Sequence, residues 1–247
     1  MPVFEMICLA NSLKHGGRCV AGFKTDGSGW LRPVSGKFDG RLYPEHYTLT
    51  NGQEAALFHI LRIECTHARP EVHQPENWAI SDRKWQFVDY ATIEQLNDLL
   101  TEEFNRVTNS PNLLGNDLDR IEWDYLQKHP VPSSLCLIGP EKISWKITSK
   151  AYGRSRNFRA IFSFQEIEYN LSITDSIWLN QMDRLSDGEY TSEDVIERLE
   201  LLNFNPKRFL LTISLGEPFQ PSQRQPMYCF KLVAAVINVQ NARALLG

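Results

Sequence analysis

The 247-residue sequence lacks the short motifs of the commonest nucleotide-binding folds. It contains no GxxxxGKS/T loop and no GxGxxG turn, so the fingerprints of P-loop and dinucleotide-binding proteins are missing. Its five cysteines are widely spaced and include no CxxC pair, which disfavours a disulfide framework and a cysteine-rich zinc site. We interpret these cysteines as buried thiols of a protein in a reducing compartment.

Long hydrophobic runs and an excess of positive charge are missing as well. No apolar run reaches the ~18–20 residues of a membrane-spanning helix, and residues 1–10 show neither a basic segment nor a cleavage signal. The formal net charge is −4, from 26 basic and 30 acidic side chains, so any nucleic-acid site has to be a local patch. We expect a soluble, cytoplasmic protein without a membrane partner.

The residues that are present are typical of a folded protein rich in β-structure. Hydrophobic residues make up 42% of the chain, and 13 Phe, 8 Tyr and 6 Trp favour sheet surfaces. Apolar runs separated by polar turns predict consecutive strands in both halves of the chain. The predicted strands are residues 3–10, 18–24, 30–35 and 56–70, and then 134–140, 142–150, 158–164, 167–173, 208–216 and 227–239.

Helical spacing is confined to a few segments. Thr92 with Gln95 behind it predicts a capped helix, and residues 192–202 predict another, with Ser192 as its cap. Strands that follow one another with few helices between them disfavour an alternating α/β fold. We therefore predict a mostly β protein of two small β-barrels, 1–130 and 131–247, each with a helical insert, because closure of a sheet removes its edges.

Six segments resemble, in order, the bacterial family of dual OB-containing domain proteins. These segments are ICLANSLKHGGRCVAG, GWLRPVS, QPENW, YNLSITD, ISLGEPF and YCFKLVAAVI. The resemblance covers nearly the whole chain and implies two OB-like barrels in tandem. OB barrels commonly bind oligonucleotides or other polyanions through one sheet face and its flanking loops, so the resemblance implies a class of partner and no particular activity.

The segment between the first two predicted strands carries Lys14 and Arg18 around a Gly-Gly pair. Two glycines let backbone N–H groups approach a phosphate, and the two cations supply charge for it. The alternative is a hairpin turn with solvated charges. Cys19 with His15 as its base is a poor nucleophile candidate, because a strand cysteine points into the core.

Two further clusters combine basic and aromatic residues. Trp30 and Arg32 share one strand face by their spacing of two, which suits base stacking and phosphate binding, unless Trp30 is a core residue. The densest basic cluster follows the predicted strand at 142–150, and its alternative is a solvated turn. Its candidate binding residues are Tyr152, Arg154, Arg156 and Arg159, with Lys150 beside them. Clusters from both barrels would suit one groove for single-stranded nucleic acid.

Carboxylates are the remaining candidates for catalysis. Asp175 and Glu217 lie in the matching segments, as does Glu76, and a nuclease needs acidic residues that converge on a metal ion. Nothing in their spacing brings them together, and Asp175 is also interpreted as a helix cap. His59 and Cys65 are ~20 Å apart along one predicted strand, so we predict no metal site and no cofactor.

The function predicted from the sequence is therefore a binding module without catalysis. Its expected partner is single-stranded nucleic acid or a nucleotide-like polyanion, within a bacterial defence or nucleic-acid-processing system. Two alternatives stay open at this point, an enzyme of phosphodiester chemistry that uses Asp175 and Glu217, and a scaffold that holds a protein partner.

Overall fold

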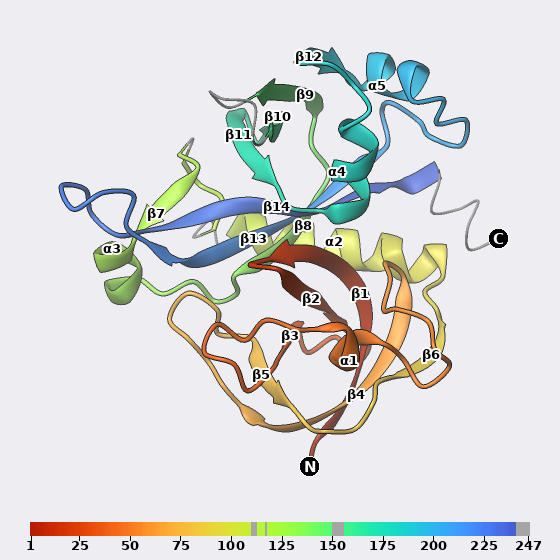
Figure 1. The fold of residues 1–247 in the computed structure, drawn as a ribbon, viewed down its shortest axis with the longest axis vertical. Helices are drawn as coiled ribbons and strands as arrows, with labels where there is room; N and C mark the ends of the chain where they lie inside the picture. Colours follow the sequence, from red (N-terminus) through yellow and green to blue (C-terminus); the bar gives the residue numbers. More distant parts are fainter. Residues whose placement is uncertain (110–112, 117, 150–155, 241–247) are drawn as a thin grey trace.

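The computed structural model describes residues 1–109, 113–116, 118–149 and 156–240. The first half of the chain forms one sheet that closes on itself (Figure 1). Its strands are β1 (Val3–Lys14), β2 (Gly17–Lys24), β3 (Trp30–Val34), β4 (His59–Ala68), β5 (Asn77–Ile80) and β6 (Gln86–Tyr90). The strand order is β1-β2-β3-β5-β4, and β4 pairs back with β1, which completes a barrel.

Strand β1 pairs with both β2 and β4 because it bends in the middle. The register with β2 shifts between Cys8 and Ala10, which is a β-bulge. Gly22 lies opposite this bulge, and a Cβ atom there would be 2.1 Å from the carbonyl oxygen of Ile7. Only glycine allows the two strands to approach this closely, so Gly22 permits the barrel to close.

The second half of the chain forms another sheet, in which the second barrel is built. Its strands are β7 (Arg120–Glu122), β8 (Leu135–Ile138), β9 (Lys142–Ser149), β10 (Arg156–Phe164), β11 (Ile167–Ile173), β12 (Gly188–Thr191), β13 (Phe209–Phe219) and β14 (Tyr228–Asn238). The strand order is β9-β10-β11-β14-β13-β8, with β12 paired to β9 and β7 paired to β14. Strands β8 and β9 are separated only by residues 139–141, so they act as two halves of one strand.

The two barrels share one topology when β8 and β9 are counted as one strand and β12 is left out. The first to fifth strands are then β1 to β5 in the first barrel, and β8 with β9, β10, β11, β13 and β14 in the second. In each barrel the first strand pairs with the second and the fourth, and the third strand is parallel to the fifth. The parallel pairs are β3 with β5 and β11 with β14. This repetition confirms the prediction of a mostly β protein with two OB-like barrels.

The helices occupy different places in the two halves. In the second barrel α4 (Ser176–Met182) and α5 (Ser192–Arg198) lie between the third and fourth strands, where the first barrel has only α1 (Pro44–Tyr47). The helices α2 (Ile93–Asn109) and α3 (Trp123–Lys128) follow the first barrel and lead into the second. Thr92 caps α2 as predicted, whereas the cap of α5 is Thr191, one residue before the prediction. No helix among the described residues is long and apolar enough to cross a membrane.

The sequence suggests a boundary between the two barrels at residues 130 and 131. Strand pairing puts the boundary between the two sheets at a different place. Strand β7 precedes this point, yet it pairs with β14, so residues 120–122 belong to the second sheet. The first barrel thus ends well before the predicted boundary, and the segment that contains α2 connects the two sheets.

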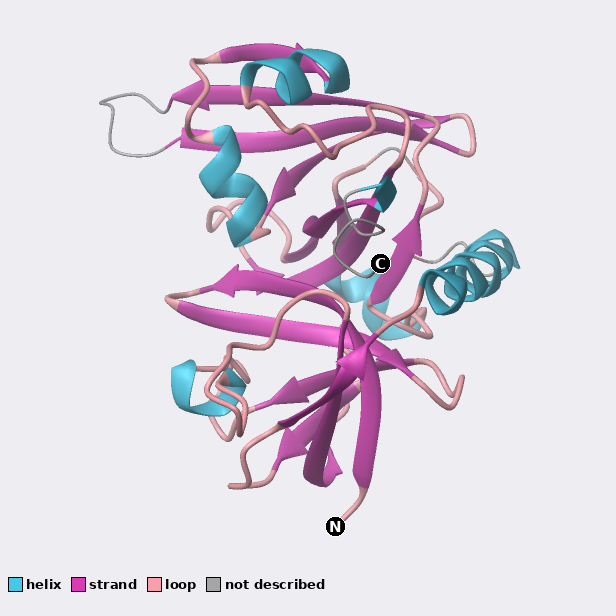
Figure 2. Ribbon diagram, turned by 90° about the vertical axis from the view of Figure 1, so that its right-hand side faces the viewer, coloured by secondary structure: helices cyan, strands magenta, loops and turns pink. Residues whose placement is uncertain are grey.

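The barrels pack against each other through an apolar core that both supply. Leu9, Phe23 and Trp30 of the first barrel belong to the same buried cluster as Leu137 and Leu210 of the second, and Leu96 and Leu99 of α2 join it. The hydroxyl of Thr212 donates a buried hydrogen bond of 2.6 Å to the carbonyl oxygen of Leu9. Figure 2 shows the two barrels stacked with α2 at one side of the junction. A shared hydrophobic core opposes independent motion of the barrels.

Candidate functional site

The turn between β1 and β2 is a tight hairpin that points toward the second barrel. Lys14 pairs with Gly17, which leaves His15 and Gly16 as the two turn residues. Both have positive φ, 46° and 82°, the pattern of a two-residue type I′ turn. The hairpin interpretation of this segment is confirmed, and the turn positions Lys14 at the junction of the barrels.

A cavity of about 660 Å³ opens at this junction. The first barrel contributes His15 of the β1–β2 turn, the loop after β3 and the β4–β5 loop, and the second half contributes Trp123 of α3 and Glu217 of β13. A second cavity of about 330 Å³ shares His15 and Glu217 with the first and extends along β13 and β14. We call the two cavities together the junction cleft.

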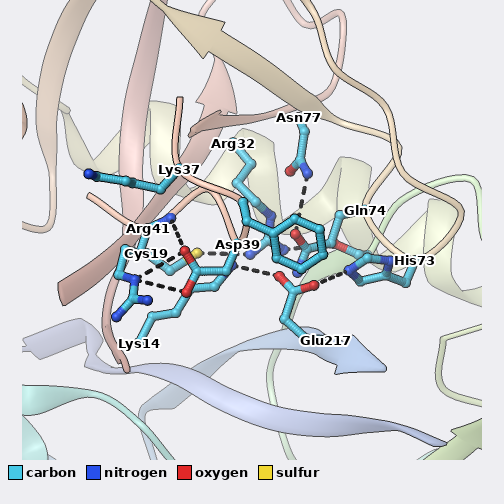
Figure 3. Close-up of polar contacts among 12 residues, drawn as sticks. Lys14, Cys19, Arg32, Lys37, Asp39, Arg41, His73, Gln74, Asn77 and Glu217 are labelled. Carbon is cyan, nitrogen blue, oxygen red and sulfur yellow. Dashed lines mark hydrogen bonds and ion pairs between the residues drawn. The ribbon is translucent and has the colours of Figure 1, made fainter. Parts of the chain in front are cut away.

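Glu217 lies at the centre of the junction cleft, between Lys14 and His73 (Figure 3). Its Oε1 is 2.6 Å from Nζ of Lys14, and its Oε2 is 2.7 Å from Nε2 of His73. Burial alone would raise the pKa of Glu217, but the hydrogen bonds from His73 and Lys14 and their charges lower it to about 2. Glu217 is therefore a carboxylate at neutral pH, and it balances the charge of Lys14.

Arg32 lies behind this centre and is buried, with 2% of its surface exposed. Its guanidinium donates to Glu76 Oε1 at 3.0 Å, and to the hydroxyls of Ser134 and Ser214 at 2.7 and 3.2 Å. It also contacts Sγ of Cys19 at 2.8 Å. Arg32 is therefore not the exposed phosphate-binding residue that the sequence predicts: it lines the smaller cavity of the junction cleft, but its guanidinium is 2% exposed and already bound by residues of both barrels.

Trp30 requires the same correction. The side chain is 4% exposed and lies in the core shared by the barrels, where its ring meets Phe23 edge-on at 5.9 Å. Its Nε1 donates to Oε2 of Glu103 on α2 at 2.9 Å. Trp30 thus has no free face for a base. Every residue of β3 is buried, because the barrel interior lies on one side of it and the junction on the other.

Asp175 has a structural role, whereas among the described residues Nη1 of Arg18 is buried without a hydrogen-bond partner. Arg18 is half-buried, and its main chain exchanges hydrogen bonds of 2.8 and 2.9 Å with Leu42. Asp175 caps α4 by accepting from the backbone N–H groups of Ile177 and Trp178, and it also accepts from Val236 at 2.8 Å. Burial raises the pKa of Asp175, and the backbone hydrogen bonds oppose this rise.

The two carboxylates considered for catalysis therefore have separate partners. Those of Asp175 are the backbone N–H groups just described, whereas Glu217 binds Lys14 and His73. Asp175 does not line either cavity of the junction cleft. Within the described part of the chain, no group of three or more His, Cys, Asp or Glu side chains is placed to hold a metal ion.

The basic cluster of the second barrel is described only in part. Lys150, Tyr152 and Arg154 lie outside the described residues. Arg156 forms ion pairs with Asp183 and Asp187 at 3.0 and 3.2 Å. Arg159 contacts the side chains of Asn170, Ser172 and Asp119. Neither arginine shares a partner with Lys14, so these contacts do not join the two predicted clusters.

The loop between β3 and α1 contains a site residue that the sequence analysis missed. Phe38 is fully exposed, at 100%, and lines the larger cavity of the junction cleft. Arg69 of the β4–β5 loop donates to the carbonyl oxygens of Ser35, Lys37 and Phe38 at 2.9, 3.1 and 3.2 Å, which holds this loop in place. The signal was an aromatic between two glycines in a polar segment, SGKFDGR.

Arg41 completes the loop. Its guanidinium pairs with Asp39 at 2.9 Å and donates to the carbonyl oxygen of His15 in the β1–β2 turn. Figure 3 shows Arg41 and Lys37 on the side of the cleft opposite to His73. Arg41, Arg69 and the exposed ring of Phe38 thus line one mouth of the junction cleft, and Lys37, which precedes Phe38 in the chain, is exposed outside this lining.

A family model described as a dual OB-containing domain matches residues 4–236. A comparison with curated proteins gives no match. The matched range takes in both barrels, α2 and α3, and every residue of the junction cleft that is named above.

Proposed function

The chain belongs to the dual OB-containing domain family, and on this premise we propose that it binds single-stranded nucleic acid in the junction cleft. OB barrels commonly bind oligonucleotides with the loop between strands 1 and 2 and the loop between strands 4 and 5. In the first barrel these are the β1–β2 turn and the β4–β5 loop, and both line the cleft.

The observation that carries the proposal is the exposed ring of Phe38 beside three cations. A base stacks on an exposed aromatic ring whatever its sequence, and Phe38 presents such a ring at the cleft. Arg69 already holds the backbone of this loop through three carbonyl oxygens, so little conformational entropy is lost when a ligand binds. Phe38 is thus a prepared stacking platform.

Phosphates of the ligand would meet the cations at the mouth of the cleft. Lys14 is balanced by Glu217 and contributes little net attraction. Lys37 is exposed, and Arg41 keeps 32% of its side chain exposed although it pairs with Asp39. These two side chains are therefore the phosphate contacts that we assign, with Arg69 as the group that positions the loop.

The proposal is tested by fluorescence anisotropy with labelled oligothymidylates and oligouridylates of about four and about twelve nucleotides. We expect binding that weakens steeply between about 50 and about 300 mM salt. Replacing Lys37 and Arg41 together by alanine should lower the salt slope by ~1.4, since each single-strand phosphate contact contributes ~0.7. A free mononucleotide added as competitor distinguishes recognition of one nucleotide from recognition of a chain.

Phe38→Ala should weaken binding of both oligonucleotides about tenfold, the effect of one stacked base. Leu202→Ala is the matched control, because Leu202 is also an exposed apolar side chain, at 92%, but lines none of the cleft. Equal binding by the Phe38 and Leu202 variants, or binding independent of salt, would contradict the proposal.

A further inference from the structure

We infer that the same oligonucleotide has a second subsite, for a nucleobase, on the sheet face formed by β13, β14 and β7. The inference rests on the proposed function and extends it from one end of the ligand to its path along the protein. Arg120, Phe219, Tyr228 and Phe230 make up this surface, and we call it the aromatic face.

Strand pairing places these four side chains on one side of the sheet. Phe219 is the cross-strand partner of Tyr228, and Arg120 is the partner of Phe230. Tyr228 and Phe230 are two residues apart on β14, so their side chains point the same way. The ring centroids of Phe230 lie 6.4 Å from Phe219 and 6.3 Å from Tyr228, which makes a continuous row.

Arg120 covers part of this row as a planar cation. Its guanidinium carbon lies 5.1 Å from the ring centroid of Tyr228 and 5.6 Å from that of Phe230. The side chain remains 39% exposed, and an ion pair with Asp119 at 3.3 Å holds it. A guanidinium over aromatic rings can also stack on a base, because arginine is planar and stacks on aromatic faces.

A cavity of about 660 Å³ lies over the β7 side of the aromatic face. Tyr125 of α3 lines it with 57% of its surface exposed, together with Arg120 and Tyr228. The amide groups of Asn116 and Gln225 and the carboxylate of Glu122 also line it. Rings together with neutral amides match the flat faces and polar edges of a nucleobase, whereas Glu122 and Asp119 would repel a phosphate.

The orientation of Asn116 supports recognition of a base edge. Its Oδ1 accepts from Nζ of the buried Lys231 at 2.9 Å and from the backbone N–H of Leu118 at 3.2 Å. With that oxygen already bound, the amide nitrogen is the group of Asn116 that can donate to a ligand in the cavity. A base with an acceptor on its edge, such as a carbonyl oxygen, fits this donor.

The aromatic face is continuous with the junction cleft. Phe219 and Phe230 line the smaller cavity of the cleft. Tyr228, the neighbour of both, lines the cavity over the β7 side of the aromatic face. An oligonucleotide that stacks on Phe38 thus reaches Arg120 by following β13 and β14. This face belongs to the fourth and fifth strands of the second barrel with β7 added, and not to the strands 2 and 3 that OB barrels commonly use.

The experiment compares the two oligothymidylate lengths on the full chain, wild type and Arg120→Ala. The shorter probe, of about four nucleotides, fills the junction cleft alone, so Arg120→Ala should leave its affinity unchanged. The longer probe should bind the wild type more tightly than the shorter one does. Arg120→Ala should weaken binding of the longer probe about tenfold relative to the wild type. Arg120→Lys keeps the charge without the planar stack, and it should recover little.

Arg198→Ala is the matched control, because Arg198 also lies over a tyrosine ring, that of Tyr190 at 5.2 Å, outside these cavities. An equal effect of the two alanine variants on the longer probe overturns the inference, as does full recovery in Arg120→Lys. If both probes bind equally and Phe38→Ala weakens both, the inference fails while the proposed function stands. If neither probe binds, the proposed function fails and the inference with it. Circular dichroism melting of each variant confirms that it is folded.

Discussion

Lys14 of β1 and Glu217 of β13 are 203 residues apart in the sequence and form an ion pair of 2.6 Å across the junction of the barrels. His73 binds the other oxygen of the same carboxylate. The side chain of Lys14 is 11% exposed and that of Glu217 is 31% exposed, so solvent screens the ion pair only in part. The contact therefore links the barrels at the centre of the candidate site, and its protonation is coupled to folding.

The stability of the protein should fall in acid through Glu217. Its pKa is lowered to about 2 in the folded state, so the folded form favours the carboxylate. The stabilisation is fully present above the unfolded pKa, ~4.3, and is lost as the pH falls from about 5 toward 2. We expect a loss on the order of 1–2 kcal/mol, measured by urea unfolding at several pH values.

The variant that tests this assignment is Glu217→Gln, which should flatten the pH dependence over that range. Glu189→Gln serves as its control, because Glu189 pairs with Lys146 at the exposed surface. A pH profile of Glu217→Gln as steep as that of the wild type would show that other carboxylates cause the acid loss.

Breaking the buried pair of Arg32 and Glu76 should destabilise the protein strongly. Arg32→Met leaves the carboxylate of Glu76 buried without its cation, which costs ~3–5 kcal/mol. Arg32→Met combined with Glu76→Leu should cost clearly less than the sum of the single changes. Arg62→Ala, which breaks an exposed pair with Glu5, should cost less than about 1 kcal/mol in the same urea experiment.

Truncation of Trp30 should destabilise the protein strongly, whereas truncation of Phe38 should hardly change its stability. Trp30→Ala opens a cavity in the core shared by the barrels, so the free energy of unfolding should fall by ~3–5 kcal/mol. Phe38→Ala removes an exposed ring and should change it by less than ~0.5 kcal/mol. Thermal melting measures both. A large destabilisation by Phe38→Ala would mean that the ring has a structural role, and its stacking role would then need revision.

The cysteines should react in two classes with a thiol reagent. Cys19 is half-buried and lines the smaller cavity of the junction cleft, whereas Cys8, Cys65, Cys136 and Cys229 are buried. Burial raises the pKa of Cys8, Cys65 and Cys229 to about 12, which keeps them protonated.

Ellman's reagent should therefore label one thiol in the folded protein, and all five in guanidinium. Cys19→Ser should abolish the folded-state reaction. An oligonucleotide in the cleft should slow the labelling of Cys19. Unchanged labelling with bound oligonucleotide would place the ligand outside the smaller cavity.

Much of the architecture was predictable because it depends on local rules. Period-two alternation predicted the strands, and Thr92 with Gln95 predicted the start of α2. The Gly-Gly pair in a polar turn between two apolar runs predicted the hairpin as one of two interpretations. The order of the segments, together with the family resemblance, predicted two OB-like barrels. The site was less accessible, because three of its predicted members, Trp30, Arg32 and Arg18, face inward or are half-buried.

The sequence by itself determined which residues alternate along a strand and where the chain turns, since these depend on backbone geometry over a few residues. Only the tertiary structure decided which strand face meets water. Trp30 and Arg32 look like surface residues until the second barrel covers β3, and Phe38 looks like an ordinary loop residue until Arg69 holds its loop beside the cleft. Burial and ion pairing depend on partners as far apart as Lys14 and Glu217, and packing alone brings such partners together.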